Sequence, residues 1–537
     1  MRMANLPGGS RGRSSARMRL TVVAMGVVTA ACGSTVAIEG QGLPQTIQNA
    51  PGATADEQAQ GLTVPSTSPS AGATVAPGDR GGQSGGTPGS TSGISATTSG
   101  TTGTTDGTTG ATGTTGTSGG TTGTTGSATG TYGPGISDDE IVIGAAIPDE
   151  ATMNNNSAIL GVEGVTTGNV ERYYDLMVEH VNASGGIAGR SIRLAKWRYS
   201  AAGSQSYAQL EQSACDYWTQ DDPAFAVPAL FTGETFLGCA QDRDLATWNS
   251  TFSTIDQGTI AKYPTHVELS AVSLTRQGRI LADGLEAQDY FDDGYKLGVV
   301  TFDAASWRRT VDESFEPRLN AHGREIADKA YVKELQSTSD VGSMTAELQS
   351  IVLRFKTQDI THVVFIDSNA TMALLFLRSA ENQAYRPRYG VTSQAGGTTL
   401  AGLAPEGQLD GALGVGWLPF YDVPGNERPG NPAADACLAR FKEQGEEPAD
   451  ENNAVVMLAT CEAIDFVKSA VEAGLPDITA TSYGHGAEAL GTFPSLTSFE
   501  NSMAPGRRDG ASLYRLVAYD GACVCFHYTS DFIADRP

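Results

Sequence analysis

The stretch Ile141-Val-Ile-Gly-Ala-Ala-Ile147, closed by Pro148, decides the fold class. An unbroken apolar run of this length suits a strand buried on both faces of a parallel sheet. Downstream, apolar residues from Val170 to Val181 recur at helical spacing, which predicts one apolar helix face ending at Gly185-Gly186. A strand followed by a helix, repeated along the chain, predicts a right-handed, doubly wound α/β lobe.

The alternation of strand and helix continues over two further stretches. In the first lobe we expect strands at 192–199 and 225–231 and a helix at 207–218. A second lobe restarts near Lys296, with expected strands at 297–302, 331–332, 362–366 and 388–391 and helices at 309–321, 344–355 and 372–384. After Gly411 the expected elements are a strand at 412–418, helices at 433–441 and 455–473, and a hairpin-like pair at 513–519 and 523–528. The predicted fold class is therefore α/β with two Rossmann-like, doubly wound lobes.

A long segment of different composition precedes the lobes. Gly accounts for 65 of the 537 residues, and only 39% of the chain is hydrophobic, which points to low-complexity sequence diluting a globular part. Residues 32–134 are rich in Gly, Thr and Ser and cannot bury enough apolar surface to offset the entropy of ordering. We interpret them as a disordered tether with a root-mean-square span of roughly 55 Å.

The first 31 residues have the pattern of a secretory signal peptide. A basic segment precedes the short apolar run 20–31, which is too short to span a bilayer. Small residues then lead into Cys32, as in the bacterial lipobox, where the cysteine is acylated and becomes the new N-terminus. This predicts a protein on the extracytoplasmic face of the cell membrane, held there by a lipid anchor. The alternative is a non-lipidated signal peptide followed by a chance cysteine.

The charge of the chain excludes one class of partner. The sequence has 35 Lys and Arg against 60 Asp and Glu, a formal net charge of −25. Phosphate binding needs a Lys/Arg surface, so we expect no nucleic-acid partner. No window reaches about 18 consecutive apolar residues, so we expect no transmembrane helix in the mature chain.

Two segments carry a resemblance to a known family. They are Gly135-Ile-Ser-Asp-Asp-Glu-Ile-Val-Ile-Gly144 and the stretch 173–194, in which Asn182-x-x-Gly-Gly-Ile-x-Gly-Arg190 is the most specific part. Over about residues 135–530 the chain resembles the type I periplasmic binding proteins, and within them the leucine/isoleucine/valine-binding branch. The resemblance implies two lobes joined by a hinge of three crossover segments and a cleft for a small-molecule ligand. It also implies a monomer that delivers its ligand to the permease and ATPase subunits of an ABC importer in the membrane.

Composition and resemblance together divide the chain into six parts. They are the signal peptide (1–31), the tether (32–134), the first part of lobe 1 (135–268), the main part of lobe 2 (269–392), a return segment of lobe 1 (393–508) and closing strands that pack on the lobes (509–537). In sheets of this kind, ligands bind at the carboxyl ends of the strands and at helix N-termini. A helix N-terminus can hold a carboxylate without a basic side chain, which suits an acidic protein that binds a small zwitterion.

The resemblance places ligand contacts in two loops of the first lobe. Thr232, Gly233 and Thr235 fall in the first contact loop, where hydroxyl and amide groups can donate hydrogen bonds. An ordinary helix cap is the alternative interpretation of these three residues. A second contact loop corresponds to 252–256 and contains the small hydroxyl residues Ser253 and Thr254. Asp256 in the same loop can face the ammonium of a ligand, or it is a solvated loop acid.

Further contacts are implied in the second lobe. Trp307 stands where the family often places an aromatic over the ligand, and its ring can cover an apolar group or an ammonium; packing inside the lobe is the alternative. Asn369 follows the strand at 362–366 and can add a polar contact. Ser393 and Gln394 fall where the branched-chain members have an acid that grips the α-amino group. Because neither is an acid, the inference of a branched-chain amino acid is weakened, and the expected ligand is an amino acid or amide-like molecule.

The remaining cysteines suggest disulfides, because their number is even in an exported protein. They are Cys215, Cys239, Cys437, Cys461, Cys523 and Cys525. The first two have a spacing similar to that of a bridge in the branched-chain branch, which implies that they pair. Cys437 and Cys461 lie on successive predicted helices and can pair. Cys523 and Cys525 would need a strained local bridge, so cross-pairing with Cys437 or Cys461 stays open. The scattered histidines and the lack of a phosphate-binding loop predict no metal and no cofactor.

These features favour one function and leave two alternatives. The favoured one is a solute-capture lipoprotein without catalysis of its own. The first alternative is a receptor of the same fold that senses its ligand and signals through a partner. The second is an exported enzyme, which is the weakest, because both G-x-S-x-G motifs lie in the tether, where a nucleophile elbow cannot form.

Overall fold

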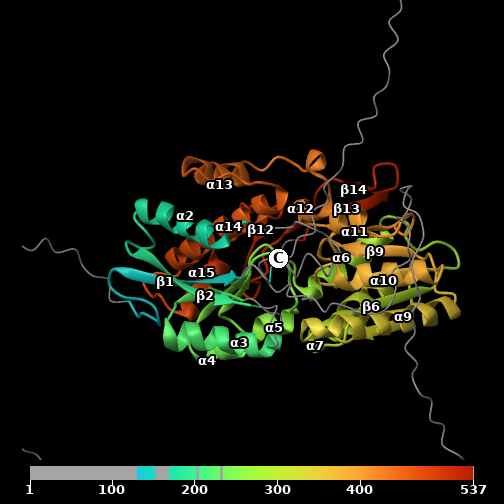
Figure 1. The fold of residues 1–537 in the computed structure, drawn as a ribbon, viewed down its shortest axis with the longest axis horizontal. Helices are drawn as coiled ribbons and strands as arrows, with labels where there is room; N and C mark the ends of the chain where they lie inside the picture. Colours follow the sequence, from blue (N-terminus) through green and yellow to red (C-terminus); the bar gives the residue numbers. More distant parts are fainter. Residues whose placement is uncertain (1–129, 150–151, 153–167, 201–204, 230–233, 536–537) are drawn as a thin grey trace, which may run out of the picture. The chain divides into compact units, whose positions relative to one another are not determined.

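The computed structural model describes residues 130–149, 152, 168–200, 205–229 and 234–535, and two large β-sheets with surrounding helices dominate them (Figure 1). The predicted signal peptide, the lipidation site Cys32 and the tether up to residue 129 lie outside the described residues. The last predicted tether residues are structured, because Tyr132 forms a parallel bridge with Ile478. Among the described helices, none is long and apolar enough to cross a bilayer.

The first sheet is wholly parallel, with the strand order β2-β1-β3-β4-β5. Its strands are β1 (Glu140–Pro148), β2 (Ser191–Tyr199), β3 (Ala226–Pro228), β4 (Ala246–Asn249) and β5 (His266–Glu268). Alternate residues of β1 serve two hydrophobic cores: Ile141 and Ile143 pack into one, and Val142 and Ala146 into the other. The apolar run of β1 is unbroken because both faces of the strand are covered.

Helices from distant parts of the sequence cover this sheet. One core contains residues of α2 (Val170–Ala183), α13 (Pro432–Glu443), α14 (Glu451–Ala473) and α15 (Ala480–Ala489). The other contains residues of α3 (Tyr207–Asp216), the π-helical turn Tyr217–Asp221, α4 (Glu234–Asp242) and α5 (Gln257–Lys262). Figure 1 shows the late helices α14 and α15, in orange and red, beside the early elements α2 and β1. The predicted doubly wound arrangement is confirmed for this sheet.

The second sheet has the order β14-β13-β10-β9-β8-β6-β7, and β15 pairs with β13. Its strands are β6 (Leu297–Phe302), β7 (Ile326–Val332), β8 (His362–Ile366), β9 (Arg388–Thr392), β10 (Leu413–Gly416), β13 (Leu513–Asp520), β14 (Cys525–Tyr528) and β15 (Ile533–Ala534). Strands β6 to β10 are parallel, whereas β13 runs antiparallel to β10, β14 and β15. A parallel core with antiparallel strands at one edge confirms the α/β class and the terminal hairpin.

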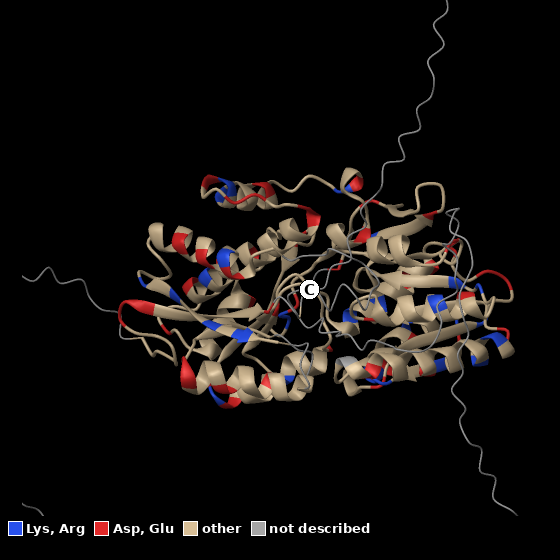
Figure 2. Cartoon of the chain, viewed as in Figure 1, with Lys and Arg blue, Asp and Glu red and all other residues tan. Residues whose placement is uncertain are grey.

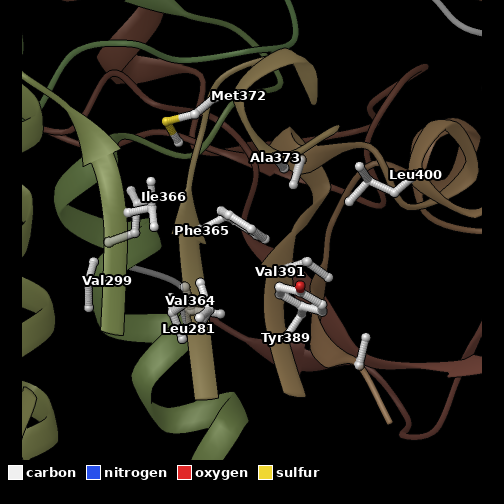
Figure 3. Packing of buried hydrophobic residues seen from close by; sticks show 14 of the residues in the cluster. Leu281, Val299, Val364, Phe365, Ile366, Met372, Ala373, Tyr389, Val391 and Leu400 are labelled. Atoms are coloured by element: carbon white, nitrogen blue, oxygen red, sulfur yellow. The ribbon is translucent and has the colours of Figure 1, made fainter. Parts of the chain in front are cut away.

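A single apolar cluster surrounds the second sheet. The helices here are α6 (Leu274–Glu286), α7 (Ala305–Arg309), α8 (Glu316–Ala321), α9 (Val341–Thr357), α10 (Thr371–Asn382), α11 (Gly397–Leu403) and α12 (Pro419–Asp422). A π-helical segment, Thr310–Phe315, joins α7 to α8. Figure 3 shows residues of β8 and β9, among them Phe365 and Tyr389, packed with Met372 of α10 and Leu400 of α11. The rings of Phe365 and Tyr389 are stacked with centroids 5.6 Å apart.

One predicted boundary needs correction. The return segment was expected to begin at 393, yet β10 pairs with β9 and β13 and so belongs to the second sheet. Phe420 of α12 packs against the clusters of both sheets, and the chain rejoins the first sheet's core at α13. The reason is the apolar side chain of Val415 in β10, which packs in the second cluster and so ties this strand to β9. A short hairpin, β11 (Thr492–Phe493) and β12 (Asn501–Ser502), follows α15 before the chain crosses to β13.

Buried polar networks hold the segments that pass between the two sheets. Arg276 of α6 donates to the Asp509 carboxylate at 2.9 Å and to that of Asp535 at 2.8 Å, and it is almost fully buried. Asp509 also accepts the backbone N–H of Ser273 at 2.9 Å. Glu462 of α14 accepts from Ser495 and Thr497 and from the backbone N–H of Leu496 at 2.7–2.8 Å. The buried charges of Arg276, Asp509 and Glu462 are therefore paired or hydrogen-bonded, as their burial demands.

Three disulfides join the six cysteines that lie in the described part of the chain. Cys215 on α3 bonds Cys239 on α4, as the resemblance implied, and Cys437 on α13 bonds Cys461 on α14. Cys523 bonds Cys525 within the β13–β14 turn, which settles the alternative left open for this pair.

On the surface, Asp and Glu are interspersed with Lys and Arg over the outer helices (Figure 2). Many of these charges pair locally, as Arg193 does with Glu140 and Asp222.

Candidate ligand-binding site

Loops at the carboxyl ends of the two sheets meet through one buried amide. Gln394, just after β9, accepts the backbone N–H of Ser253 at 2.6 Å and donates to the Ser253 carbonyl at 2.8 Å. The same amide group lies 3.2 Å from the Asp367 carbonyl that follows β8. Because Ser253 follows β4 of the first sheet, this side chain links the two strand edges at which an α/β protein binds its ligand. Gln394 and Ser253 are both completely buried.

A second link between the two sheets is an ion pair. Asp256 caps α5 by accepting the backbone N–H of Thr259 at 2.8 Å, and it binds Arg309 of α7. Burial opposes ionisation of Asp256, but the hydrogen bonds from Arg309 and Thr259 outweigh it and lower the pKa of this carboxyl. The Thr259 hydroxyl lies 3.2 Å from that of Ser306 in α7. The cation facing Asp256 is thus a guanidinium of the chain itself.

Two buried carboxyl groups stand beside the Gln394 amide link. Burial raises the pKa of Asp367 to about 6, although its oxygens accept backbone N–H groups from Ala373 and Ser368. Burial raises the pKa of Asp422 to about 7, against hydrogen bonds from Ser393 and Tyr528. Both groups lie at the carboxyl edge of the second sheet, so this edge can take up protons near neutral pH.

The other predicted contact residues have varied surroundings. Trp307 is buried, donates to Glu334 at 2.7 Å and packs edge-on against Phe302. Ser393 accepts the backbone N–H groups of Trp417 and Leu418 at 2.7 and 3.2 Å. The positions of the rest are as follows: Thr254 is buried, Asn369 accepts the backbone N–H of Thr371, Thr235 is exposed on α4, and Thr232 and Gly233 lie outside the described residues.

Three residues at these edges were not identified from the sequence. Arg309 follows Trp307 by two positions, and its partner Asp256 is 53 residues away. The hydroxyl of Thr251 and the indole N–H of Trp417 are buried atoms without a hydrogen-bond partner; Trp417 directly follows β10, and Thr251 lies two residues after the end of β4. A buried polar atom left unpaired is costly, so each is a group that a ligand can satisfy. Only their position after a strand could have indicated them.

Comparison with known proteins now adds to this geometry. No family model matches the chain, and no curated protein matches it in sequence. Solved structures do match. A solute-binding protein of an ABC transporter from R. palustris, in complex with 4-hydroxybenzoate, has a TM-score of 0.54 at 13% identity, over 74% of this chain and 98% of that one. The chain has the type I periplasmic binding protein fold.

Two further solved structures agree with this assignment of the fold. A branched chain amino acid ABC transporter protein from Thermus thermophilus with bound valine has a TM-score of 0.51 at 13% identity, over 74% of this chain and 98% of that one. A fatty acid ABC transporter substrate-binding protein from Thermomonospora curvata has a TM-score of 0.51 at 15% identity, over 75% and 95%. The binding-protein fold predicted from the segments 135–144 and 173–194 is thereby confirmed.

Proposed function

We propose that this chain is an extracytoplasmic solute-binding lipoprotein, anchored through Cys32, that captures a small polar ligand and delivers it to an ABC importer. The ligand class we propose is an amino acid or amide-like molecule. The observation that carries the proposal is the meeting of the two polar strand edges at Gln394 and Ser253. A ligand bound there touches both sheets, so it stabilises the state in which they are together.

The choice of contact groups follows from which polar atoms are free to bind. We propose that the hydroxyl of Thr251 and the indole N–H of Trp417 bind the ligand, because both are buried and unpaired. The neighbouring Thr254, Asn369 and Thr235 stay in the proposed contact set. In Trp307 the indole N–H is engaged by Glu334, so we assign its ring a supporting role.

The solved structures support a role in ligand capture, and the ligands named in them differ in chemical class. Proteins of this fold hold 4-hydroxybenzoate or valine, and another is named for a fatty acid transporter. All three ligand types carry a carboxylate, which the neutral N–H and O–H groups at these edges can bind. We propose no catalytic step for the chain itself.

A thermal-shift screen of the full-length protein against amino acids, amides and aromatic acids tests the proposal. A ligand present at about 100 times its Kd raises stability by about 2.7 kcal/mol, which gives a visible shift. Thr251→Ala and Trp417→Phe should reduce the shift, whereas Thr357→Ala, at the exposed end of α9 and outside the proposed contact set, should leave it nearly unchanged. An undiminished shift in both buried variants would contradict the proposed contacts.

We keep a second function, ligand sensing, because the same proposed ligand contacts would serve it. If the chain is a receptor, its deletion removes a ligand-dependent response while uptake of that ligand continues. If it is a transport protein, deletion stops uptake of the ligand found in the screen. Measuring uptake of the radiolabelled ligand by cells with and without the chain distinguishes the two.

A further inference from the structure

The turn between β13 and β14 contains a disulfide with only one residue inside it. Cys523 and Cys525 are joined, and Val524 lies between them. Cys523 is exposed, and the side chain of Val524 is 51% exposed, which is unusual for a large aliphatic residue. In the other two bridges, Cys215, Cys437 and Cys461 have no exposed surface, and Cys239 is half-buried. A nucleophile can therefore reach the turn disulfide without opening the fold.

The backbone of this turn is also strained. Val524 has a φ of +56°, in the left-handed region that a β-branched residue rarely adopts. Cys525 is held in register opposite Asp520 of β13, and the disulfide ties Cys523 to it, so the residues on both sides of Val524 are linked. The cost of one left-handed residue corresponds to about a tenfold change in an equilibrium constant. Opening the disulfide lets Val524 relax, which favours reduction.

A groove borders the turn, and the charged side chains that line it determine which thiols can approach. Its volume is about 870 Å³, and Tyr519, Gly521 and Val524 form its wall on the side of the turn. Across from them, Glu406 and Asp410 come from the segment between α11 and β10. Burial raises the pKa of Tyr519, and the charges of Asp410, Asp520 and Glu406 add to this effect. The groove is also lined by Arg386, which pairs with Glu381 at 2.7 Å, so its charged groups are negative on balance and repel an anionic thiol.

We propose that Cys523–Cys525 is a thiol–disulfide exchange site that reacts with neutral or cationic thiols. In the first step a thiolate attacks the sulfur of Cys523, a mixed disulfide forms, and Cys525 leaves as a thiolate that takes up a proton. The second thiol of a dithiol then attacks the mixed disulfide and releases Cys523. The protein gains two electrons and two protons, and the dithiol becomes a disulfide. The bridges on α3–α4 and α13–α14 keep a structural role.

The test is native-state reduction of the full-length protein by a dithiothreitol series, followed by alkylation with iodoacetamide and peptide mass spectrometry. We expect Cys523 and Cys525 to be alkylated while the other four cysteines stay protected. Val524→Asn keeps both sulfurs but tolerates the left-handed conformation, so it should need about ten times more reductant. Reduction of all three bridges together overturns the proposal, and an unchanged midpoint in Val524→Asn overturns the contribution of strain.

A separate experiment tests whether the turn disulfide selects thiols by their charge. Cysteamine, a cation, should reduce the Cys523–Cys525 disulfide faster than 2-mercaptoethanesulfonate, an anion. Asp410→Asn should bring the two rates of reduction closer together. Equal rates for the two thiols at low salt, with or without Asp410→Asn, overturn the selection by charge. Since the site lies on β13–β14, this result is independent of any ligand found for the strand edges.

Discussion

The substitution Asp422→Asn tests the electrostatics of the carboxyl edge most directly. Asp422 is 3% exposed at the end of α12 and accepts the backbone N–H of Leu418 and the hydroxyl of Tyr528, each at 3.0 Å. Burial raises its pKa from an ordinary 3.8 to about 7. An asparagine side chain has nearly the same shape and can still accept both hydrogen bonds, but it carries no charge to bury.

The pH-dependent change in stability that Asp422 causes follows from its pKa in the unfolded and in the folded protein. In the unfolded chain Asp422 loses its proton near pH 3.8, whereas in the folded protein it keeps it until about pH 7. Its contribution to stability is therefore fully present below pH 3.8 and is lost as the pH rises to about 7. The loss amounts to about 4 kcal/mol, because one pKa unit corresponds to about 1.4 kcal/mol. Asp422→Asn does not ionise and should keep this stability at alkaline pH.

Urea unfolding of the two proteins at pH 4, 6 and 8 measures the effect. The free energy of unfolding of the variant minus that of the wild type should increase by about 4 kcal/mol between pH 4 and pH 8. Asp293→Asn is the matched control, since it removes an exposed carboxyl from the same lobe. The expectation is refuted if the free energy of unfolding of the variant minus that of the wild type stays constant with pH. It is also refuted if the variant is less stable than the wild type at pH 8, and either result would show that the folded protein holds an ionised Asp422.

Three other substitutions, one of them with a matched control, have defined expectations. Gln394→Ala leaves the backbone N–H and carbonyl of Ser253 buried and unpaired, and should lower the free energy of unfolding by about 2–4 kcal/mol in the same urea assay. Gly414→Ala puts a Cβ 2.1 Å from a backbone carbonyl oxygen of β9 and should abolish soluble expression, whereas Gly430→Ala meets open space and should express normally. Cys437→Ser removes the α13–α14 bridge and should cost about 2–5 kcal/mol, and a smaller loss would mean that packing alone holds the two helices.

The strands were the part of the fold most accessible from sequence. Expected strands at 297–302 and 362–366 coincide with β6 and β8, because each is a short apolar run buried on both faces and ended by polar residues. The assignment of β10 to a lobe failed. Sheet membership depends on pairing with β9 and β13, and the β13 partner is about a hundred residues further along the chain. Local pattern contains no information on such a partner.

In the candidate site, too, the positions of residues could be predicted from local sequence, whereas their hydrogen-bond partners could not. The position of Gln394 after a strand was readable from the sequence, but its three hydrogen-bond partners lie at Ser253 and Asp367 and depend on the meeting of two sheets. Trp307 was recognisable as an aromatic residue after β6. Its engagement by Glu334, on the segment that follows β7, could not be derived from spacing.

The ion pair between the two sheets also constrains the ligand. Asp256 already serves two purposes, since it caps α5 and binds Arg309. A ligand ammonium would have to displace a guanidinium whose side chain is 37% exposed, and it would leave that cation without its partner. The unpaired groups at the edges, by contrast, are the neutral Thr251 hydroxyl and Trp417 N–H, and neither requires such a displacement. A carboxylate or amide oxygen can accept a hydrogen bond from either group, whereas an ammonium could use only the Thr251 hydroxyl, so the polar end of the ligand that these edges favour is an acceptor.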